Sequence, residues 1–223
     1  MPRRLDIAQV NISGFAVLTL LAGLVAAAVL DPPSENRVPK VSDEDRRITA
    51  YHESGHALLA AHLPAGGDIL QVTIVSRWGV LGSMTRASAD SDLGDDARRA
   101  RKEAELVIAL GGLLAEAIAR GDGAMTDAMT SDIKAAERIA YELLGGPAAG
   151  LTVAEADAGV RRLMDEAERR ARDILASHEA QLHSLAAALL DHGTLEAVDI
   201  AHILAGGTLS RDTRKRPDAL TAG

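Results

Sequence analysis

The sequence predicts an α+β domain that is predominantly α-helical, with a small β-hairpin and a helical carboxyl-terminal part. Of its 223 residues, 47% are hydrophobic but only 2% are aromatic, so the core must be built largely from aliphatic side chains. Aliphatic residues recur at helical spacing after residue 97, whereas β-branched residues alternate over residues 69–75. We therefore expect closely packed helices around one small β element.

The amino terminus carries a long apolar run. Residues 12–30 contain no charged side chain and approach the roughly 20 residues that a membrane-spanning helix needs. Arg3 and Arg4 precede the run and more basic residues follow it, a bias that favours a cytoplasmic carboxyl-terminal side. We predict a single-pass signal anchor. A cleaved signal peptide, ending near Ala26-Ala27-Ala28, and an ordinary buried helix are the alternatives.

Breaks in the pattern give the predicted boundaries. Pro32 and Pro33 interrupt any helix after the apolar run, and the chain from Gly206 onward is polar. The expected segments are a short amino-terminal piece (1–11), a transmembrane helix (12–30), a linker (31–41), a folded domain (42–205) and a disordered tail (206–223).

The first helix of the folded domain is predicted over about residues 43–62. Ser42 and Asp45 fit a capping box at its start, and Pro64-Ala65-Gly66-Gly67 is a stop signal. This helix contains the pattern His-Glu-x-x-His.

His52 and His56 lie one turn apart on the same face of that helix, so both imidazoles can reach one metal ion. A zinc ion with two histidines needs a third protein ligand and keeps one position for water, whose pKa it lowers from about 15.7 toward about 7. Glu53 is beside the histidines and is placed to take the proton of that water. The alternative is an amphipathic helix whose histidines only pack or face solvent.

The remaining elements follow in order. A hairpin is predicted from strands at 69–75 and 80–85, with Trp78 in its turn. An exposed edge strand near a metal site can bind an extended peptide. Helices are then expected over 97–120, 131–144, 152–192 and 195–204. Gly111-Gly112 in the first of these costs helix stability, so another helix should approach closely there.

The third metal ligand is not decided by local spacing. His62 has the spacing of a longer zinc motif, but Leu59 favours continuing the helix, which turns His62 by roughly 120° from His56. Aspartates farther along the chain are the remaining donors. Asp127 and Asp132 are both candidates because they stand near the start of a predicted helix.

Composition excludes several classes of function. The formal net charge of −8 argues against nucleic acid as the main partner. The chain has no cysteine, which excludes disulfides, thiolate zinc ligands and a cysteine nucleophile. It also contains neither a G-x-x-x-x-G-K-[ST] nor a G-x-G-x-x-G pattern.

From about residue 41 to 204, an ordered series of short stretches resembles the peptidase domain of FtsH-type membrane-bound AAA proteases. The stretches are Arg46-Arg47-Ile48-Thr49-Ala50-Tyr51-His52-Glu53-Ser54-Gly55-His56-Ala57, Val72-Thr73-Ile74 with Leu81-Gly82, Leu110-Gly111-Gly112 with Ala115-Glu116, and Ser131-Asp132-Ile133 with Ala135-Ala136. The resemblance implies that His52, His56 and Asp132 bind Zn²⁺ and that Glu53 is the general base. It also implies protein or peptide substrates.

We therefore expect a zinc metalloendopeptidase that acts on unfolded or flexible proteins. The family threads its substrates by ATP hydrolysis, and we expect this chain, which shows no ATPase module, to work without ATP. Besides its substrates, the protein partners that we consider are further copies of this chain, in a homo-oligomer, or a separate ATPase. The alternative is a zinc-binding adaptor without catalysis that regulates a full-length FtsH-type protease.

Overall fold

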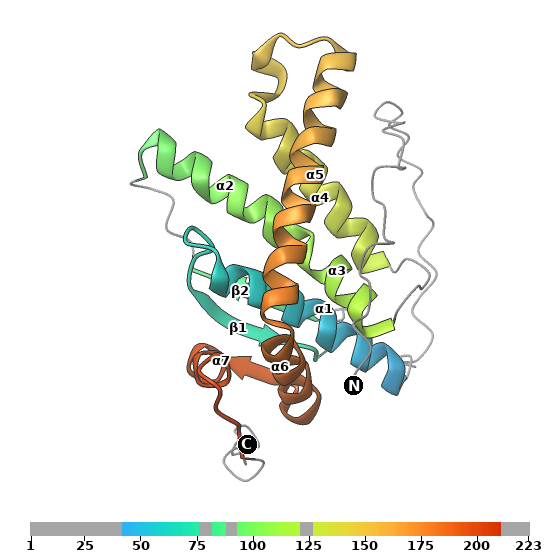
Figure 1. Ribbon diagram of the computed structural model, residues 1–223, viewed down its shortest axis with the longest axis vertical. Helices are drawn as coiled ribbons and strands as arrows, with labels where there is room; N and C mark the ends of the chain where they lie inside the picture. Colours follow the sequence, from blue (N-terminus) through green and yellow to red (C-terminus); the bar gives the residue numbers. More distant parts are fainter. Residues whose placement is uncertain (1–41, 76–81, 88–92, 121–126, 211–223) are drawn as a thin grey trace, which may run out of the picture.

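The computed structural model describes residues 42–75, 82–87, 93–120 and 127–210 (Figure 1). Its elements are α1 (Asp43–His62), β1 (Ile69–Thr73), β2 (Ser83–Arg86), α2 (Asp95–Ala109), α3 (Gly111–Arg120), α4 (Asp127–Leu143), the 3-10 helix η2 (Gly146–Ala149), α5 (Val153–Ser177), α6 (Glu179–His192), β3 (Thr194–Glu196) and α7 (Ala197–Leu204). The predicted α+β class, with helices predominating, is confirmed.

Helix α1 is the central element, because α2, α3, α5, α6 and strand β1 all pack against it (Figure 1). Its start is the predicted capping box: the Ser42 hydroxyl accepts a hydrogen bond from the Asp45 N–H, and the Asp45 carboxylate accepts one from the Ser42 N–H. Its last turn closes with a bond from the Leu63 N–H to the Leu59 carbonyl. The predicted bounds of this helix are confirmed.

The predicted hairpin is present as the antiparallel pair β1 and β2. A third strand, β3, pairs antiparallel with the other edge of β1, so the sheet order is β2-β1-β3. Val72 of β1 and Leu195 of β3 pair with each other and face the core. The predicted turn with Trp78 lies outside the described residues.

The prediction of one helix over 97–120 is wrong. The structure has two helices, α2 and α3, which meet at Leu110. The break directly precedes the two glycines, where another helix was expected to approach closely. A Cβ on Gly111 would lie 2.8 Å from the Gly55 carbonyl oxygen, and one on Gly55 would lie 2.3 Å from the Gly111 carbonyl oxygen. Helices α1 and α3 therefore touch backbone to backbone.

The carboxyl-terminal helices also differ in their ends. The predicted 152–192 helix breaks at His178, where φ is −125° and ψ is 26°. The His178 ring stacks on His62 with ring centres 3.7 Å apart. The predicted 195–204 helix begins at 197, because 194–196 pair with β1 instead. Of the predicted tail, residues 206–210 are described and Leu209 packs against the core. Residues 211–223 lie outside the description.

The core is aliphatic, as expected from the composition. Its largest fully buried hydrophobic side chains come from α1, the residue between α2 and α3, α3, α5, α6 and the sheet. They are Leu58, Leu59, Leu110, Leu114, Leu175, Leu182, Leu185, Leu189, Leu195 and Val72. Because α1 contributes to the centre of this core, its two histidines sit on a firmly held helix.

The predicted transmembrane helix over 12–30 lies outside the described residues. Among the helices that are described, none has both the length and the apolar character needed to cross a membrane.

Ser54 gives a prediction for stability. Its side chain is 0% exposed, and among the described residues its Oγ finds no hydrogen-bond partner. Ser54→Ala should raise the free energy of unfolding by about 1 kcal/mol, because a buried hydroxyl without a partner carries a desolvation cost and Ala is the better helix former. Urea unfolding curves measure the change.

Ser184→Ala is the matched control for this substitution. Ser184 is exposed on α6, and its Oγ donates to the Ala180 carbonyl at 2.9 Å. This control should change the free energy of unfolding by no more than about 0.5 kcal/mol. A loss of stability in Ser54→Ala would contradict the idea that the hydroxyl is unpaired.

Candidate metal centre

Three side chains from two helices converge in the middle of the domain. The Nε2 atoms of His52 and His56, both on α1, are 3.1 Å apart, and the Asp132 Oδ2 atom from α4 is 3.1 Å from each of them. Within the described part of the chain, this is the group of His, Cys, Asp and Glu residues whose ligand atoms are close enough to hold a metal ion. The structure thus brings Asp132 to the two histidines.

Hydrogen bonds behind the rings orient both imidazoles. The His56 Nδ1–H donates to the Ile108 carbonyl at 2.8 Å. The His52 Nδ1 lies 2.8 Å from Glu116 Oε1, and it donates to this carboxylate. In the neutral imidazoles, the lone pairs of both Nε2 atoms then face the Asp132 carboxylate.

Three acceptor atoms that face one another need a cation between them. A tetrahedral zinc ion with bonds of about 2.0–2.1 Å would place its ligand atoms about 3.3 Å apart. The observed separations of 3.1 Å are close to this value. The donor set, two imidazoles and one carboxylate, also suits zinc in a catalytic site. The residues present therefore fit the ion.

Burial and hydrogen bonding also shift the pKa values of His52 and Asp132. Burial lowers the pKa of His52, but hydrogen bonds to Asp132 and Glu116 outweigh it and raise the pKa to about 10. Burial raises the pKa of Asp132, but hydrogen bonds from His52 and His56 outweigh it and lower the pKa to about 2. The site without an ion thus holds a proton, and a metal ion that binds near neutral pH must displace it.

Glu53 follows His52 on α1 and is 5% exposed. Burial raises its pKa above the ordinary value of 4.5, while the imidazoles of His56 and His52 oppose this rise. Gly82, just before β2, lies directly against it: a Cβ there would be 2.4 Å from Glu53 Oε1. The start of β2 is therefore in contact with the carboxylate that was predicted to be the base.

Gly112 completes the wall of the site. A Cβ on this residue would be 2.4 Å from His52 Cε1 and 2.6 Å from His56 Nε2. Only hydrogen at this position lets α3 pass so close to both rings. The pair Gly111-Gly112 thus has two separate tasks, since Gly111 contacts the α1 backbone and Gly112 contacts the imidazoles.

The other two candidate ligands are located as follows. His62 Nε2 is 2.8 Å from Gln181 Oε1 on α6, and the His62 ring stacks on His178. His62 is therefore part of the packing between α1 and the joint of α5 and α6, apart from the metal group. Asp127 is the first residue of α4, the helix that carries Asp132.

Glu116 was not assigned a role from the sequence. It is 1% exposed, its Oε1 bonds His52, and its Oε2 is 3.6 Å from Arg120 Nη2. A signal was present, because Glu116 is the one charged residue in the apolar stretch 106–119. Burial of a carboxylate is costly unless a partner pairs with it, so a glutamate in such a stretch indicates a partner. The role of the Ile108 carbonyl, in contrast, could not be predicted, because a backbone acceptor does not depend on the residue type.

Comparison with known proteins agrees with this geometry. The profile of peptidase family M41 matches residues 39–145, which include α1, the β1–β2 pair, α2, α3 and α4 with all four site residues. Over these residues the chain is similar to peptidase family M41. The resemblance to an FtsH-type peptidase domain is thereby confirmed.

Named relatives extend the match beyond the M41 region. The chain is similar to the ATP-dependent zinc metalloprotease FtsH of Rickettsia prowazekii, with 31% identity over 79% of this chain and 31% of the relative. It is also similar to the ATP-dependent zinc metalloprotease FTSH 11, chloroplastic/mitochondrial, of Arabidopsis thaliana, with 32% identity over 77% of this chain and 23% of the relative. FtsH 3 of Conexibacter woesei is 38% identical over 80% of this chain and 27% of the relative. The chain spans less than a third of the length of these relatives. Zinc is the metal that their names give, and it is the metal that the His-His-Asp group fits.

Proposed function

We propose that this chain is a zinc metalloendopeptidase that hydrolyses peptide bonds of unfolded or flexible proteins without ATP. The observation that carries the proposal is the convergence of His52, His56 and Asp132 beside the buried carboxylate of Glu53. The names of the M41 relatives support the same chemistry.

Each site residue has one task in the proposed reaction. His52, His56 and Asp132 hold the zinc ion. Bound zinc supplies Lewis-acid chemistry, which acidifies water and polarises a peptide carbonyl. Glu53 accepts the proton of the attacking water and delivers it to the leaving amine. Glu116 and the Ile108 carbonyl keep the two imidazoles oriented.

Strand β2 is the proposed docking edge for the substrate. In the sheet of the described residues, β2 pairs with β1 on one side and is an edge strand on the other. An extended peptide can add to such an edge through main-chain hydrogen bonds. The strand starts at Ser83, next to the Gly82 that touches Glu53, so a peptide on this edge would pass the base.

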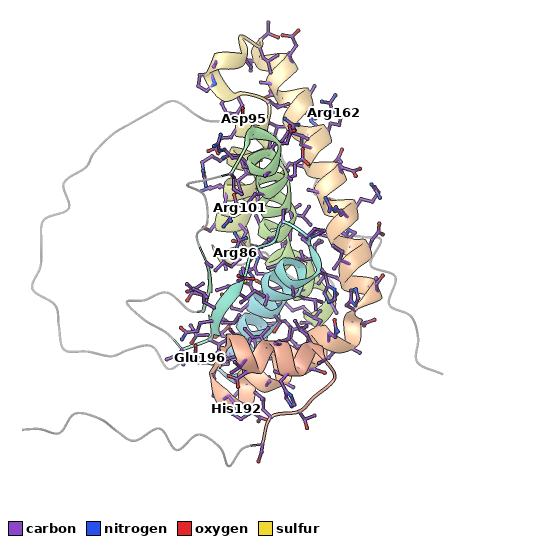
Figure 2. The ribbon with its side chains drawn as sticks, turned by 90° about the vertical axis from the view of Figure 1, so that its left-hand side faces the viewer. Arg86, Asp95, Arg101, Arg162, His192 and Glu196 are labelled. Atoms are coloured by element: carbon purple, nitrogen blue, oxygen red, sulfur yellow. The ribbon has the colours of Figure 1, made fainter. Side chains whose placement is uncertain are left out.

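The far end of β2 is tied to the body of the domain. Arg86 Nη1 donates to the Gly66 carbonyl at 2.5 Å. Arg86 and Arg101, both labelled in Figure 2, lie 3.9 Å and 3.6 Å from Glu105 of α2. Arg101 also donates to the Ala87 carbonyl just after the strand. These contacts support a rigid edge, which lowers the entropy cost of binding a flexible chain.

The proposed setting follows from the sequence. Residues 12–30 would anchor the chain in a membrane by a single pass, with the peptidase domain on the cytoplasmic side. Protein and peptide substrates are the main partners, a homo-oligomer or a separate ATPase would be additional, and nucleic acid is not expected. The proposed chemistry uses residues from His52 to Asp132 and consumes no nucleotide, although the relatives are named ATP-dependent.

A paired cleavage assay tests the proposal. Folded domains are closed by about 5–15 kcal/mol, so a buried peptide bond is rarely accessible without an unfolding motor. The purified 223-residue protein should therefore cleave casein and a destabilised domain, and it should leave the stable parent domain intact. ATP should not change either rate, and a zinc chelator should abolish both.

Three outcomes would contradict the proposal. Equal cleavage of the stable and the destabilised domain would show that cleavage does not depend on unfolding of the substrate. Stimulation by ATP in the highly purified protein would exclude the ATP-independent reaction. No cleavage of casein by protein loaded with zinc would favour the adaptor instead.

A further inference from the structure

Among the described residues, buried hydrophobic side chains form two separate clusters. The large one is the core described above. The small one consists of Leu113 of α3 and Met129 and Ile133 of α4, which are 3%, 6% and 8% exposed. Leu113 follows Gly112, the residue against the imidazoles, and Ile133 follows the carboxylate Asp132. The small cluster is therefore placed at the metal centre.

Helix α4 is attached to the domain at two places along its length. Its carboxyl-terminal half contributes Ala136, Ile139, Ala140 and Leu143 to the large core. Its amino-terminal half contributes Met129 and Ile133, which pack on Leu113 in the small cluster. Asp132 lies within the amino-terminal attachment, between Met129 and Ile133 in the chain. Its carboxylate reaches the imidazoles, and its side chain remains 22% exposed.

We infer that Leu113, Met129 and Ile133 form an apolar clamp that holds Asp132 against His52 and His56 and so sets the affinity for the metal ion. This inference rests on the proposed function, because it takes Asp132 to be a ligand. None of the three residues belongs to the converging group of possible ligands, and they act by positioning Asp132.

The physical reason lies in the tolerance of a metal site. Ligand atoms must be held to within about 0.5 Å of their working positions, and the first turns of a helix fray unless side chains fix them. The large core holds α4 from Ala136 to Leu143, but among the described residues it includes none from the preceding turn, which carries Asp132. Packing of the clamp against α3, which also adjoins the imidazoles, fixes carboxylate and imidazoles to the same support.

Two isoleucines on α4 provide a matched pair of substitutions. Ile133 belongs to the clamp and Ile139 to the large core, and both are 8% exposed. Ile133→Ala and Ile139→Ala remove the same atoms from the same helix at the same degree of burial. The zinc dissociation constant is measured by chelator competition, with thermal unfolding as the measure of structural damage. The Glu53→Gln background prevents self-cleavage and makes the readout independent of catalysis.

We expect Ile133→Ala to weaken zinc binding by about 10–100-fold, as loss of the groups that orient a ligand usually does. Ile139→Ala should leave the dissociation constant within about twofold at a similar loss of thermal stability. Leu113→Ala, made on the other helix, should resemble Ile133→Ala, and Leu113→Met should restore most of the affinity. The absorption spectrum of bound Co²⁺ should shift in Ile133→Ala toward that of Asp132→Ala.

The inference is overturned if Ile133→Ala and Ile139→Ala change zinc affinity by the same factor, or if neither changes it. It is also overturned if Asp132→Ala binds zinc like the parent. Where an alanine variant does not fold, Ile133→Val and Ile139→Val give the same comparison with less damage. Failure of the proposed function looks different, because tight, clamp-dependent zinc binding would then accompany a parent protein that does not cleave casein.

Discussion

Replacing Glu53 by Gln is expected to lower kcat for peptide hydrolysis by about 10²–10⁴-fold, the contribution of a well-placed general base. The amide has nearly the same shape as the carboxylate but cannot accept the proton of the attacking water. Glu53 is not one of the three converging side chains that could hold the ion, so zinc affinity should stay within about twofold. Initial rates on casein and chelator competition measure the two quantities.

The same substitution should change stability with a defined dependence on pH. Burial raises the pKa of Glu53 above its ordinary 4.5, so the folded metal-free protein disfavours the ionised form. This cost is absent below pH 4.5 and grows as the pH rises through the folded-state pKa. The metal-free Gln variant should therefore be more stable than the parent at neutral pH, and the difference should vanish in acid.

Glu166→Gln is the control for the loss of a carboxylate. Glu166 is exposed on α5 and pairs with Arg169 at 2.5 Å, and it does not belong to the group of possible metal ligands. Its rate of cleavage should equal that of the parent. If Glu53→Gln cleaved casein at an undiminished rate after removal of host proteases, the assigned base would be wrong.

Gly112→Ala is expected to weaken zinc binding by about 100-fold or more and to reduce cleavage to background. The added Cβ would lie 2.4 Å from His52 Cε1 and 2.6 Å from both His52 Nδ1 and His56 Nε2. Either the rings leave their hydrogen bonds to Glu116 and Ile108, or α3 moves away from α1. In a free helix the substitution would be favourable by about 1 kcal/mol, so a loss of function would come from the contact with the rings.

Gly159→Ala on α5 is the matched control for Gly112→Ala. Its Cβ would meet the Leu144 side-chain methyls at 2.7 Å and 3.1 Å, and the end of a leucine can rotate away. Zinc affinity and cleavage should then equal those of the parent. Isothermal titration with zinc compares the two variants, and parent-like binding by Gly112→Ala would contradict the close packing of α3 on the imidazoles.

Features that depend on near neighbours in the chain were predictable from the sequence. The capping box of Ser42 and Asp45, the bounds of α1 and the shared face of His52 and His56 all follow from spacings of three or four residues on one helix. The pairing of β1 with β2 follows from alternation. The sequence also signalled the close approach at Gly111-Gly112, because two glycines in a helix need a packing reason.

The sequence by itself thus determined the helical α+β class, the metal-binding pattern on α1 and the aliphatic core. Only the tertiary structure decided how Asp132 meets the histidines, that Glu116 and the Ile108 carbonyl orient them from 64 and 52 residues away, and that Gly82 touches Glu53. It also decided the break at Leu110 and the third strand β3. The physical reason is that periodicity reports which face of an element is buried, whereas side-chain packing between distant segments selects which element covers it and which polar groups meet there.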